Sequence, residues 1–317
     1  MPDKEKSLKT ETERLIEEFL EDLELARNCS PLTLRNYRHY LGRFSSWLKK
    51  NFPKAKLTLV DLEIIKKYRL FLTRFTAPDG TPLSRSTQAY HLIALRSFFK
   101  WLIKNDWEVL SPEKIDVPKM PERNLKFLTT DQVSRLLAQP EISHPRGLRD
   151  RAILETLFST GLRVSELVKL NRDQIDLKRR EFGVVGKGGR ARVVFLSFSA
   201  AKWLGRYLAT RTDPWRPLFI RLPGKNPPLV DGEKMRLTAR SVQRIVKKYV
   251  RKAKLPVDAT THTLRHSFAT DLLMAGADIR SVQEMLGHKN IATTQIYTHV
   301  TNRQLRQIHE AFHGKGR

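Results

Sequence analysis

The sequence predicts a mainly α-helical protein with an N-terminal four-helix bundle, followed by a mostly helical domain that contains a small antiparallel β-hairpin. Apolar residues recur at spacings of three and four over most of the chain, which is the periodicity of amphipathic helices. One stretch, EFGVVGKGGRARVVFLS at residues 181–197, instead places two valine-rich arms around a glycine-rich turn and predicts paired strands. The length of 317 residues exceeds the usual size of one domain and favours two.

Four helices are expected before residue 108. Apolar residues recur at helical spacing between Thr10 and Leu25. The next helix begins after Ser30, a good N-cap, with Pro31 at its first position, where a missing N–H costs nothing. A third helix covers VDLEIIKKYRLFLTRF and ends at the turn-forming APDGTP, and a fourth covers SRSTQAYHLIALRSFFKWLIKN. These four amphipathic segments predict a bundle over residues 1–107.

A linker is expected between the two domains. The stretch LSPEKIDVPKMPERN has three prolines, several charges and no sustained periodicity, which is typical of an extended interdomain segment, so we place the linker at residues 108–122.

In the second domain, residues 123–317, the helix of GLRDRAILETLFSTG is stopped by Gly161 as a C-terminal cap, and another begins at once with LRVSELVKL. Beyond the hairpin the periodicity is helical again.

The charge of the chain indicates a polyanionic partner. Its 59 Lys and Arg residues against 33 Asp and Glu give +26 and a pI near 10.4, which favours nucleic acid over a surface that is merely soluble. The first 30 residues run against this trend, with nine acidic and five basic residues. We therefore expect the first helix to serve packing or contact with a neighbouring subunit rather than binding of nucleic acid.

Cysteine use and hydropathy indicate a cytoplasmic protein. The single cysteine, Cys29, cannot form an intrachain disulfide and is expected to be a small buried or half-buried residue in a reducing compartment. The sequence shows neither an N-terminal apolar segment nor an apolar run long enough to span a bilayer. We expect a cytoplasmic location and no membrane partner.

Three common kinds of catalytic site find no support in the sequence. His262 and His266 stand at i and i+4, but the glutamate of a zinc-protease helix and an acidic third ligand are missing. The stretch GKGGR lacks the spacing and the Ser or Thr of a phosphate-binding loop, and no cluster of Asp and Glu suggests a two-metal nuclease. We therefore expect neither a metal ion nor a nucleotide cofactor.

Basic and imidazole groups gather instead at the expected ends of elements. Arg163 lies in the first turn after the Gly161 stop, and His262 and Arg265 share one face of another helix start, after two threonine caps. Because helix N-termini expose N–H groups and a positive dipole end, both regions suit a phosphate oxygen. Each of these residues alone has an ordinary structural explanation, but their combination in this order is not expected by chance. It is completed by Lys187 at the hairpin tip, His288 after Gly287 at a helix end, and Tyr297.

In these residues and their order the sequence resembles the tyrosine recombinase (lambda-integrase-like) family, most closely the short Xer-type site-specific recombinases, over nearly the whole chain. The resemblance implies a core-binding (DNA-binding) helical domain at residues 1–107 and a catalytic domain at residues 123–317. Glu166 matches a frequent acidic supporting position. By the same resemblance the catalytic residues are Arg163 in TGLRVSEL, Lys187 in VGKGGRARVVFLS, His262 and Arg265 in HTLRHSFAT, and His288 and the nucleophile Tyr297 in LGHKNIATTQIYTHV.

The family implies that its tyrosine attacks a DNA phosphodiester, giving a 3′-phosphotyrosyl link and a free 5′-hydroxyl. The arginines suit the charge that gathers on the phosphate oxygens, and His288 adds a hydrogen bond. His262 is the candidate base, and Lys187 the candidate acid for the leaving 5′-oxygen. Because the covalent link conserves the bond energy and the arginines neutralise the phosphate, neither ATP nor a divalent metal is required. Glu166 either orients a basic neighbour or forms a simple surface ion pair.

The implied partner is double-stranded DNA with a specific core site. The family further implies a tetramer on two sites, built from this chain alone or with a paralogous recombinase. A DNA translocase is a possible activator. The tail after Tyr297 carries Leu305, Ile308 and Phe312 and could pack on its own domain. The resemblance to Xer-type recombinases implies instead that it docks into a neighbouring protomer, and we favour this docked form. Weaker candidates for DNA contacts, each equally compatible with a solvated helix face, are Arg35, Arg38, Arg85, Arg240 and Arg244.

The biological role has several alternatives. Xer-type resolution of chromosome or plasmid dimers competes with integration of a mobile element, and we favour resolution because the sequence starts directly with the helical bundle. A type IB-like topoisomerase would share the tyrosine, arginines and lysine, but the short bundle and the tail disfavour it. A non-catalytic DNA-binding protein on the same fold is disfavoured because no catalytic position departs from the family pattern.

Overall fold

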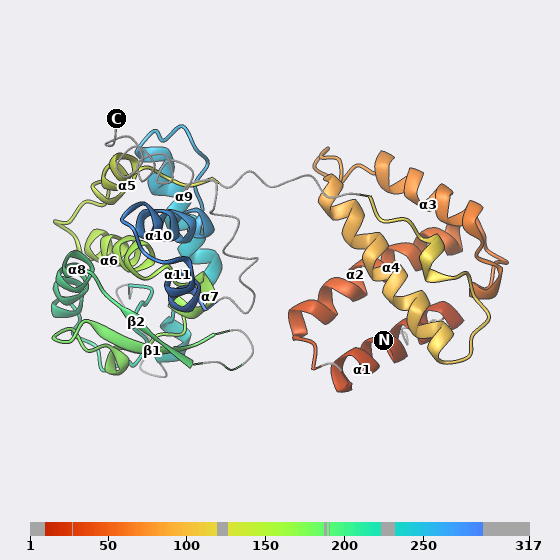
Figure 1. The fold of residues 1–317 in the computed structure, drawn as a ribbon, viewed down its shortest axis with the longest axis horizontal. Helices are drawn as coiled ribbons and strands as arrows, with labels where there is room; N and C mark the ends of the chain where they lie inside the picture. The colour runs from red at the N-terminus through yellow and green to blue at the C-terminus, as the bar shows by residue number, and fades with distance from the viewer. Residues whose placement is uncertain are drawn as a thin grey trace, which may run out of the picture. The chain divides into compact units, whose positions relative to one another are not determined.

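The computed structural model describes residues 10–26, 28–118, 126–186, 189, 191–222 and 232–287. This part of the chain is mostly helical, with one two-stranded antiparallel sheet, so the predicted fold class is confirmed (Figure 1). The chain divides into two compact units, Met1–Arg123 and Asn124–Arg317. None of the described helices is long and apolar enough to cross a membrane.

The described residues of the first unit form four α-helices, and side chains cap the start of each. Thr10, Ser30, Asp61 and Ser84 each accept a hydrogen bond from a backbone N–H in the first turn, which satisfies one of the donors that a helix start leaves unpaired. The helices are α1 (Glu11–Leu25), α2 (Pro31–Asn51), α3 (Leu62–Arg74) and α4 (Arg85–Lys104), with 3₁₀ turns at Leu57–Leu59 and Pro112–Lys114.

Aromatic side chains fill the core of the first unit. Phe19 of α1 lies 5.5 Å from Phe98 of α4, and Phe44 of α2 lies 5.0 Å from Tyr68 of α3, measured between ring centroids. The acidic helix α1 therefore serves packing, because its apolar face is buried against α2 and α4. Cys29 is half-buried and packs against the same core.

In the described part of the expected linker, apolar side chains pack on the first unit. Pro112 and Ile115 are buried, and Val109, Leu110 and Val117 pack against the core of the first unit. These apolar side chains, spaced irregularly between prolines and charges, carry no helical or strand period, so the sequence pattern did not reveal that they are anchored.

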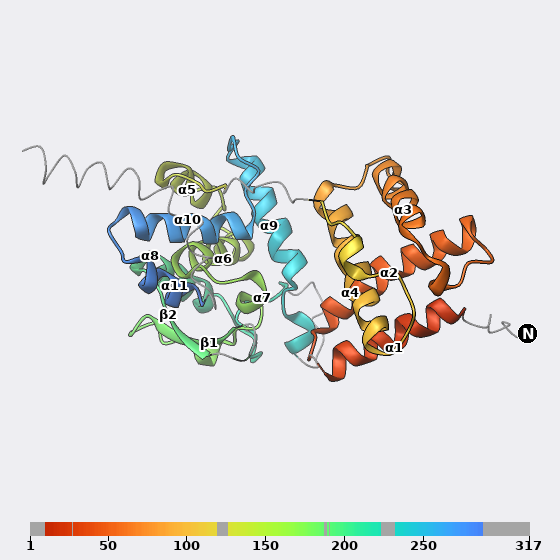
Figure 2. The ribbon, with the colours of Figure 1, turned by 45° about the vertical axis from the view of Figure 1, so that its right-hand side comes forward.

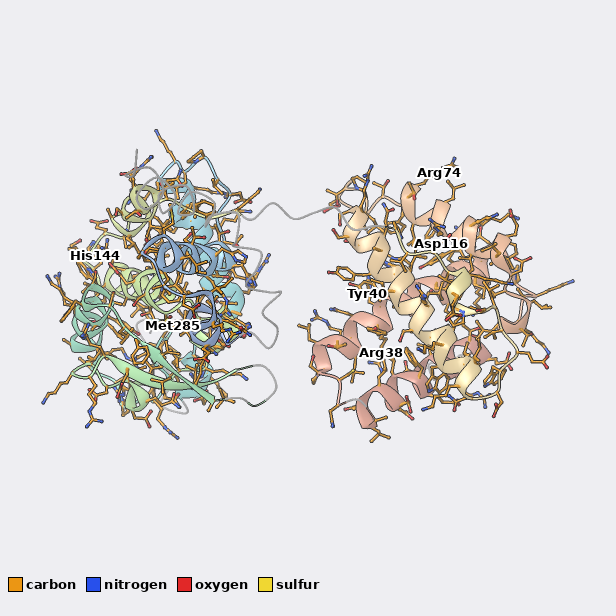
Figure 3. The ribbon with its side chains drawn as sticks, viewed as in Figure 1. Arg38, Tyr40, Arg74, Asp116, His144 and Met285 are labelled. Carbon is orange, nitrogen blue, oxygen red and sulfur yellow. The ribbon has the colours of Figure 1, made fainter. Side chains whose placement is uncertain are left out.

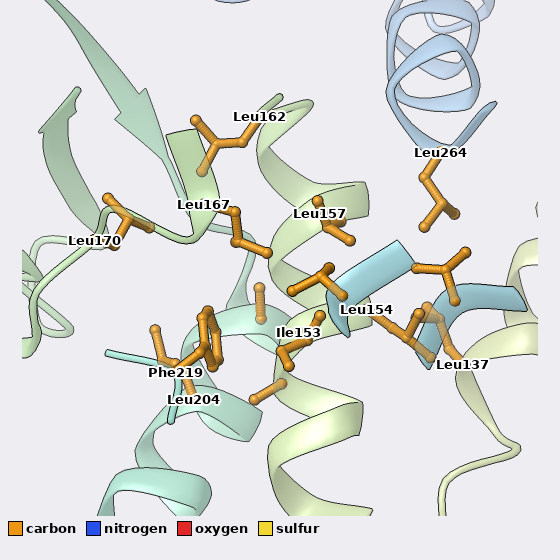
Figure 4. Packing of buried hydrophobic residues seen from close by; sticks show 14 of the residues in the cluster. Leu137, Ile153, Leu154, Leu157, Leu162, Leu167, Leu170, Leu204, Phe219 and Leu264 are labelled. Carbon is orange, nitrogen blue, oxygen red and sulfur yellow. The ribbon is translucent and has the colours of Figure 1, made fainter. Parts of the chain in front are cut away.

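The second unit is built around α6 (Pro145–Thr160). This helix is buried on nearly all sides, and Figure 4 shows its Ile153, Leu154 and Leu157 pointing into a cluster of leucines and Phe219. Its neighbours in space include α8 and α10 (Figures 1 and 2). The other elements are α5 (Thr130–Leu137), α7 (Val164–Leu167), β1 (Glu181–Val185), β2 (Ala191–Phe195), α8 (Phe198–Ala209), α9 (Ala239–Lys252), α10 (Thr261–Met274) and α11 (Ile279–Leu286), with 3₁₀ turns at Arg172–Gln174 and Gly232–Met235.

The hairpin of β1 and β2 packs one face on the second unit. Glu181 pairs with Phe195 and Val185 with Ala191, so the strands are in register over their whole length. Val184 and Val194 are buried, whereas Val193 and Phe195 are exposed, as the alternation of side chains along a strand requires. β2 also contacts α11, which brings the hairpin beside the C-terminal end of the described chain.

Candidate active site

The site begins at the corner between α6 and α7. Gly161 ends α6 with a left-handed backbone (φ 58°, ψ 22°), and its N–H donates to the carbonyl of Leu157 at 3.1 Å. The chain then turns at once into Arg163, which is the N-cap of α7 rather than a residue of its first turn. The sharp stop at Gly161 therefore presents Arg163 at the start of a new helix, where N–H groups point outward.

Glu166 anchors Arg163 from within α7. Its Oε2 accepts from the backbone N–H of Arg163 at 3.0 Å, and its Oε1 accepts from Nη1 of the same residue at 2.9 Å. Glu166 is only 7% exposed. Burial alone would raise the pKa of this carboxyl, but hydrogen bonds from Arg192 and Arg163 outweigh it and lower the pKa. Of the two interpretations of Glu166, the structure favours orientation of basic neighbours over a surface ion pair.

Arg192 of β2 is a site residue that the sequence analysis missed. Its Nη1 and Nη2 donate to Oε1 and Oε2 of Glu166 at 3.2 and 2.8 Å, and its Nε donates to the carbonyl of Met285 at 3.1 Å. One signal was available in the sequence: Arg192 is two residues before Val194 on a strand, so both point inward, and an inward arginine requires partners. What those partners are depends on the fold.

Arg265 links the corner to the end of α11. Thr260 caps α10, which places Arg265 in its second turn, where the side chain is only 3% exposed. Nη1 donates to the carbonyl of Gly161 at 2.6 Å, and Nη2 donates to the carbonyl of Leu286 at 2.6 Å. The two predicted arginines are thus brought together, because Arg163 follows Gly161 by two residues.

His262 stands on the same face of α10, one turn before Arg265. Partial burial, followed by the positive charges of Arg265 and Arg163, lowers the pKa of His262 below its usual 6.5, although much of the side chain is exposed. The imidazole is therefore mostly neutral at neutral pH and able to accept a proton. His266 lies deeper, and burial, with the charges of His262 and Arg265, lowers its pKa to about 4.

The remaining predicted catalytic residues, Lys187, His288 and Tyr297, lie outside the described residues. Of the predicted DNA contacts, Arg38 on α2 (Figure 3) donates from Nε and Nη2 to the carboxylate of Glu17 at 3.1 and 2.7 Å, so part of its charge is already balanced. The other four, Arg35, Arg85, Arg240 and Arg244, are exposed on their helices.

Two arginines and a neutral imidazole around one helix corner are chemically suited to an anionic ester such as a phosphodiester. Comparison with known proteins gives the same class. Residues 126–304 match the phage integrase family, and residues 16–106 match the N-terminal SAM-like domain of phage integrases. The chain belongs to this family and is a site-specific tyrosine recombinase, most similar to the Xer type.

Curated relatives cover almost the full chain. The tyrosine recombinase XerC of Pelotomaculum thermopropionicum is 36% identical over 95% of this chain and 98% of its own length. The tyrosine recombinase XerD of Lacticaseibacillus casei is also 36% identical, over 95% of this chain and 99% of its own length.

Solved structures share the fold. The crystal structure of XerA recombinase is 28% identical, with a TM-score of 0.50, over 97% of this chain and all of that one. The XerH site-specific recombinase, in a post-cleavage complex with its palindromic difH substrate, is 23% identical, with a TM-score of 0.67, over 93% of this chain and 84% of that one.

Proposed function

We propose that this recombinase cuts and rejoins double-stranded DNA through a 3′-phosphotyrosyl intermediate, with Tyr297 as the nucleophile. The observation that carries the proposal is the convergence of Arg163, Arg265 and a neutral His262 at the Gly161 corner. A phosphodiester gathers negative charge on its non-bridging oxygens as it is attacked, and planar guanidinium groups match that charge and its geometry.

Each residue has a role set by its chemistry. Arg163 and Arg265, together with His288, bind the non-bridging oxygens of the scissile phosphate. A tyrosine hydroxyl has a pKa of about 10 and must lose its proton as it attacks, and the lowered pKa of His262 keeps an acceptor available for it. Lys187 donates a proton to the leaving 5′-oxygen. The reaction exchanges one phosphate ester for another, so it consumes no ATP, and the two arginines take the place of a divalent metal.

The two parts of the chain divide the work. Residues 1–107 are the core-binding domain, residues 108–122 the linker and residues 123–317 the catalytic domain. Phosphate contacts from both domains supply affinity for DNA in the cytoplasm. The exposed Arg35, Arg85, Arg240 and Arg244 are better candidates for these contacts than Arg38, since Glu17 competes for its guanidinium.

Single-turnover cleavage tests the roles of the two arginines. A nicked suicide DNA carrying the core site traps the covalent adduct, which is resolved on a denaturing gel. Arg163→Ala and Arg265→Ala should each slow adduct formation roughly 100- to 1,000-fold, the effect of losing about 3 to 4 kcal/mol of charge stabilisation. DNA binding by both variants should persist. Cleavage at the rate of the unaltered chain by either variant would reject its proposed role.

The full-length similarity to Xer recombinases supports a role in dimer resolution, with a tetramer of this chain, alone or with a paralogous recombinase, on two core sites. A plasmid with two directly repeated sites should yield two smaller circles, with or without an added DNA translocase. Joining of an unrelated circle to a target would indicate an integrase instead. Relaxation of supercoiled DNA without any specific site would indicate a topoisomerase.

We assign the C-terminal tail to a pocket of the second unit in a neighbouring copy of the chain. This pocket has a volume of about 360 Å³ and is lined by apolar side chains that include Phe158, Phe195, Phe268, Leu272 and Met285. A short segment with Leu305, Ile308 and Phe312 offers apolar groups of matching chemistry.

Removal of residues 301–317 tests this assignment. The shortened chain should bind a single site normally but lose recombination between two sites. A pocket variant, Leu272→Glu, should show the same defect in the full-length chain. Recombination by the shortened chain at the full rate would reject the docked tail.

A further inference from the structure

Arg192 joins two parts of the site through one guanidinium group. It binds both carboxylate oxygens of Glu166, and its Nε donates to the carbonyl of Met285. Its side chain is 11% exposed, so water competes little for these charge-assisted bonds. Met285 lies in the last turn of α11 (Figure 3), so the guanidinium ties this helix end to Glu166.

Glu166 in turn orients Arg163, because both arginines bind its carboxylate. The carboxylate is shared by two arginines, since Oε1 accepts from Nη1 of Arg163 at 2.9 Å while Arg192 bridges both oxygens. A planar carboxylate held on one side by an arginine fork has a fixed orientation, and the Arg163 side chain is fixed with it. Without Arg192, the single charge of Glu166 would fall on Arg163 alone and draw it away from a phosphate.

The end of α11 is held from two directions. Its last carbonyls have no partner within the helix, and Arg192 and Arg265 bind two of them, those of Met285 and Leu286. Gly287 follows with φ 65°, and a Cβ built there would lie 3.1 Å from Nη1 of Arg192. The chain that continues from this point carries His288 and Tyr297.

We propose that Arg192 is a positioning residue for DNA cleavage, which holds Arg163, through Glu166, in register with the end of α11. The proposal rests on the role of Arg163 as a phosphate ligand. Only an arginine fits this position, because a lysine offers one nitrogen and cannot bridge a carboxylate while also reaching the Met285 carbonyl. Arg192 thereby sets the position of the Arg163 guanidinium relative to the end of α11.

The matched pair Arg192→Lys and Arg211→Lys tests the proposal. Arg211 also grips a carboxylate with two nitrogens, Asp213 at 2.5 and 2.6 Å, and also donates to backbone carbonyls, but at the far end of α8. Arg192→Lys should slow adduct formation on saturating suicide DNA about 10- to 100-fold, the usual range for groups that orient a reacting one. Arg211→Lys should leave this rate constant unchanged, and both variants should bind DNA within about threefold of the unaltered chain.

Coupling separates positioning from a general loss of structure. In an Arg163→Ala background, Arg192→Lys should cause no further slowing, because its effect passes through Arg163. In a Glu166→Gln background, Arg192→Lys should likewise cause no further slowing of adduct formation. This background replaces Arg163→Ala if the double variant of Arg163 and Arg192 folds poorly. Additive losses in both backgrounds, or full-rate cleavage by Arg192→Lys, would overturn the proposal. An adduct formed by Tyr297→Phe would instead reject the proposed function, whatever Arg192 does.

Discussion

Gly161 combines a backbone role with a packing role at a single position. Its left-handed φ of 58° ends α6, and a Cβ built on it would lie 2.5 Å from Cδ1 of Phe268 on α10. Its carbonyl accepts the hydrogen bond of Arg265. Any side chain here would therefore strain the backbone, push α10 away and disturb the arginine at once.

The pair Gly161→Ala and Gly276→Ala isolates the packing part of this effect. Both glycines have positive φ, but a Cβ on Gly276 meets nothing within 4 Å. Gly276→Ala should lower the free energy of unfolding by about 1 kcal/mol, and Gly161→Ala by about 2 to 4 kcal/mol with slower cleavage. Urea unfolding and adduct assays measure the two effects. Equal destabilisation by the two changes would contradict the close approach of Gly161 to Phe268.

The lowered pKa of His262 predicts how cleavage depends on pH. A base must be neutral to accept a proton, so cleavage falls as pH drops through the pKa of His262. Because burial and two arginines lower that pKa, the midpoint should lie below the 6.5 of an ordinary histidine. Single-turnover rates between pH 5 and 8 should rise and then level off, and His262→Ala should lose this rise. A midpoint above 6.5 would argue against the proposed setting of the imidazole.

At the scale of single residues, sequence patterns pointed to candidate residues that lie at expected helix starts. Arg163, His262 and Arg265 were recognisable because they stand at helix starts in fixed spacing. Arg192 was not, because its partner Glu166 is 26 positions away and only the hairpin brings them together. Its contact with Met285 spans 93 positions and depends on the packing of α11 against β2.

At the scale of elements, α9 presents a strongly two-sided helix. Val242, Val246 and Val250 are buried in the core of the second unit. The opposite face is basic and exposed: Arg240, Arg244, Lys247, Lys248 and Arg251. A row of cations at helical spacing can follow a phosphate backbone.

The basic face of α9 predicts the salt dependence of DNA binding. Arg240→Ala with Arg244→Ala should weaken binding and lower the slope of log affinity against log salt by about 1 for each arginine. Lys202→Ala with Arg206→Ala on α8, which lies across the unit from α9 in Figures 1 and 2, is the control with the same change of charge. Gel shifts at several salt concentrations measure both. An equal slope change in the control would mean that net charge, not this face, matters.

Element boundaries show where sequence patterns lose precision. The caps at Ser30 and Gly161 were readable because each residue type has a specific role at a helix end. The start of α6 was placed too late, since Pro145 at its first position extends it before the first apolar residue. Residues 109–117 pack on the first unit through apolar side chains without a period, so only the three-dimensional core reveals their anchoring.

At the scale of the whole molecule, the net charge and the fold both indicate DNA as the partner. The net charge of +26 suits a polyanion, and the match to phage integrases extends over both compact units. The arginines at the Gly161 corner bind carboxylate and carbonyl oxygens within the protein, the same kinds of contacts that a phosphate would use. Recombination by this site requires that Tyr297 become attached to DNA.

Mapping the covalent adduct tests this claim most directly. After reaction with nicked suicide DNA carrying the core site, nuclease and protease digestion followed by mass spectrometry locates the attached nucleotide. We expect a 3′-phosphate on the tyrosine of the peptide that contains Tyr297, and no adduct from Tyr297→Phe, which still binds the site. A nucleotide on another residue, or an adduct that survives Tyr297→Phe, would contradict it.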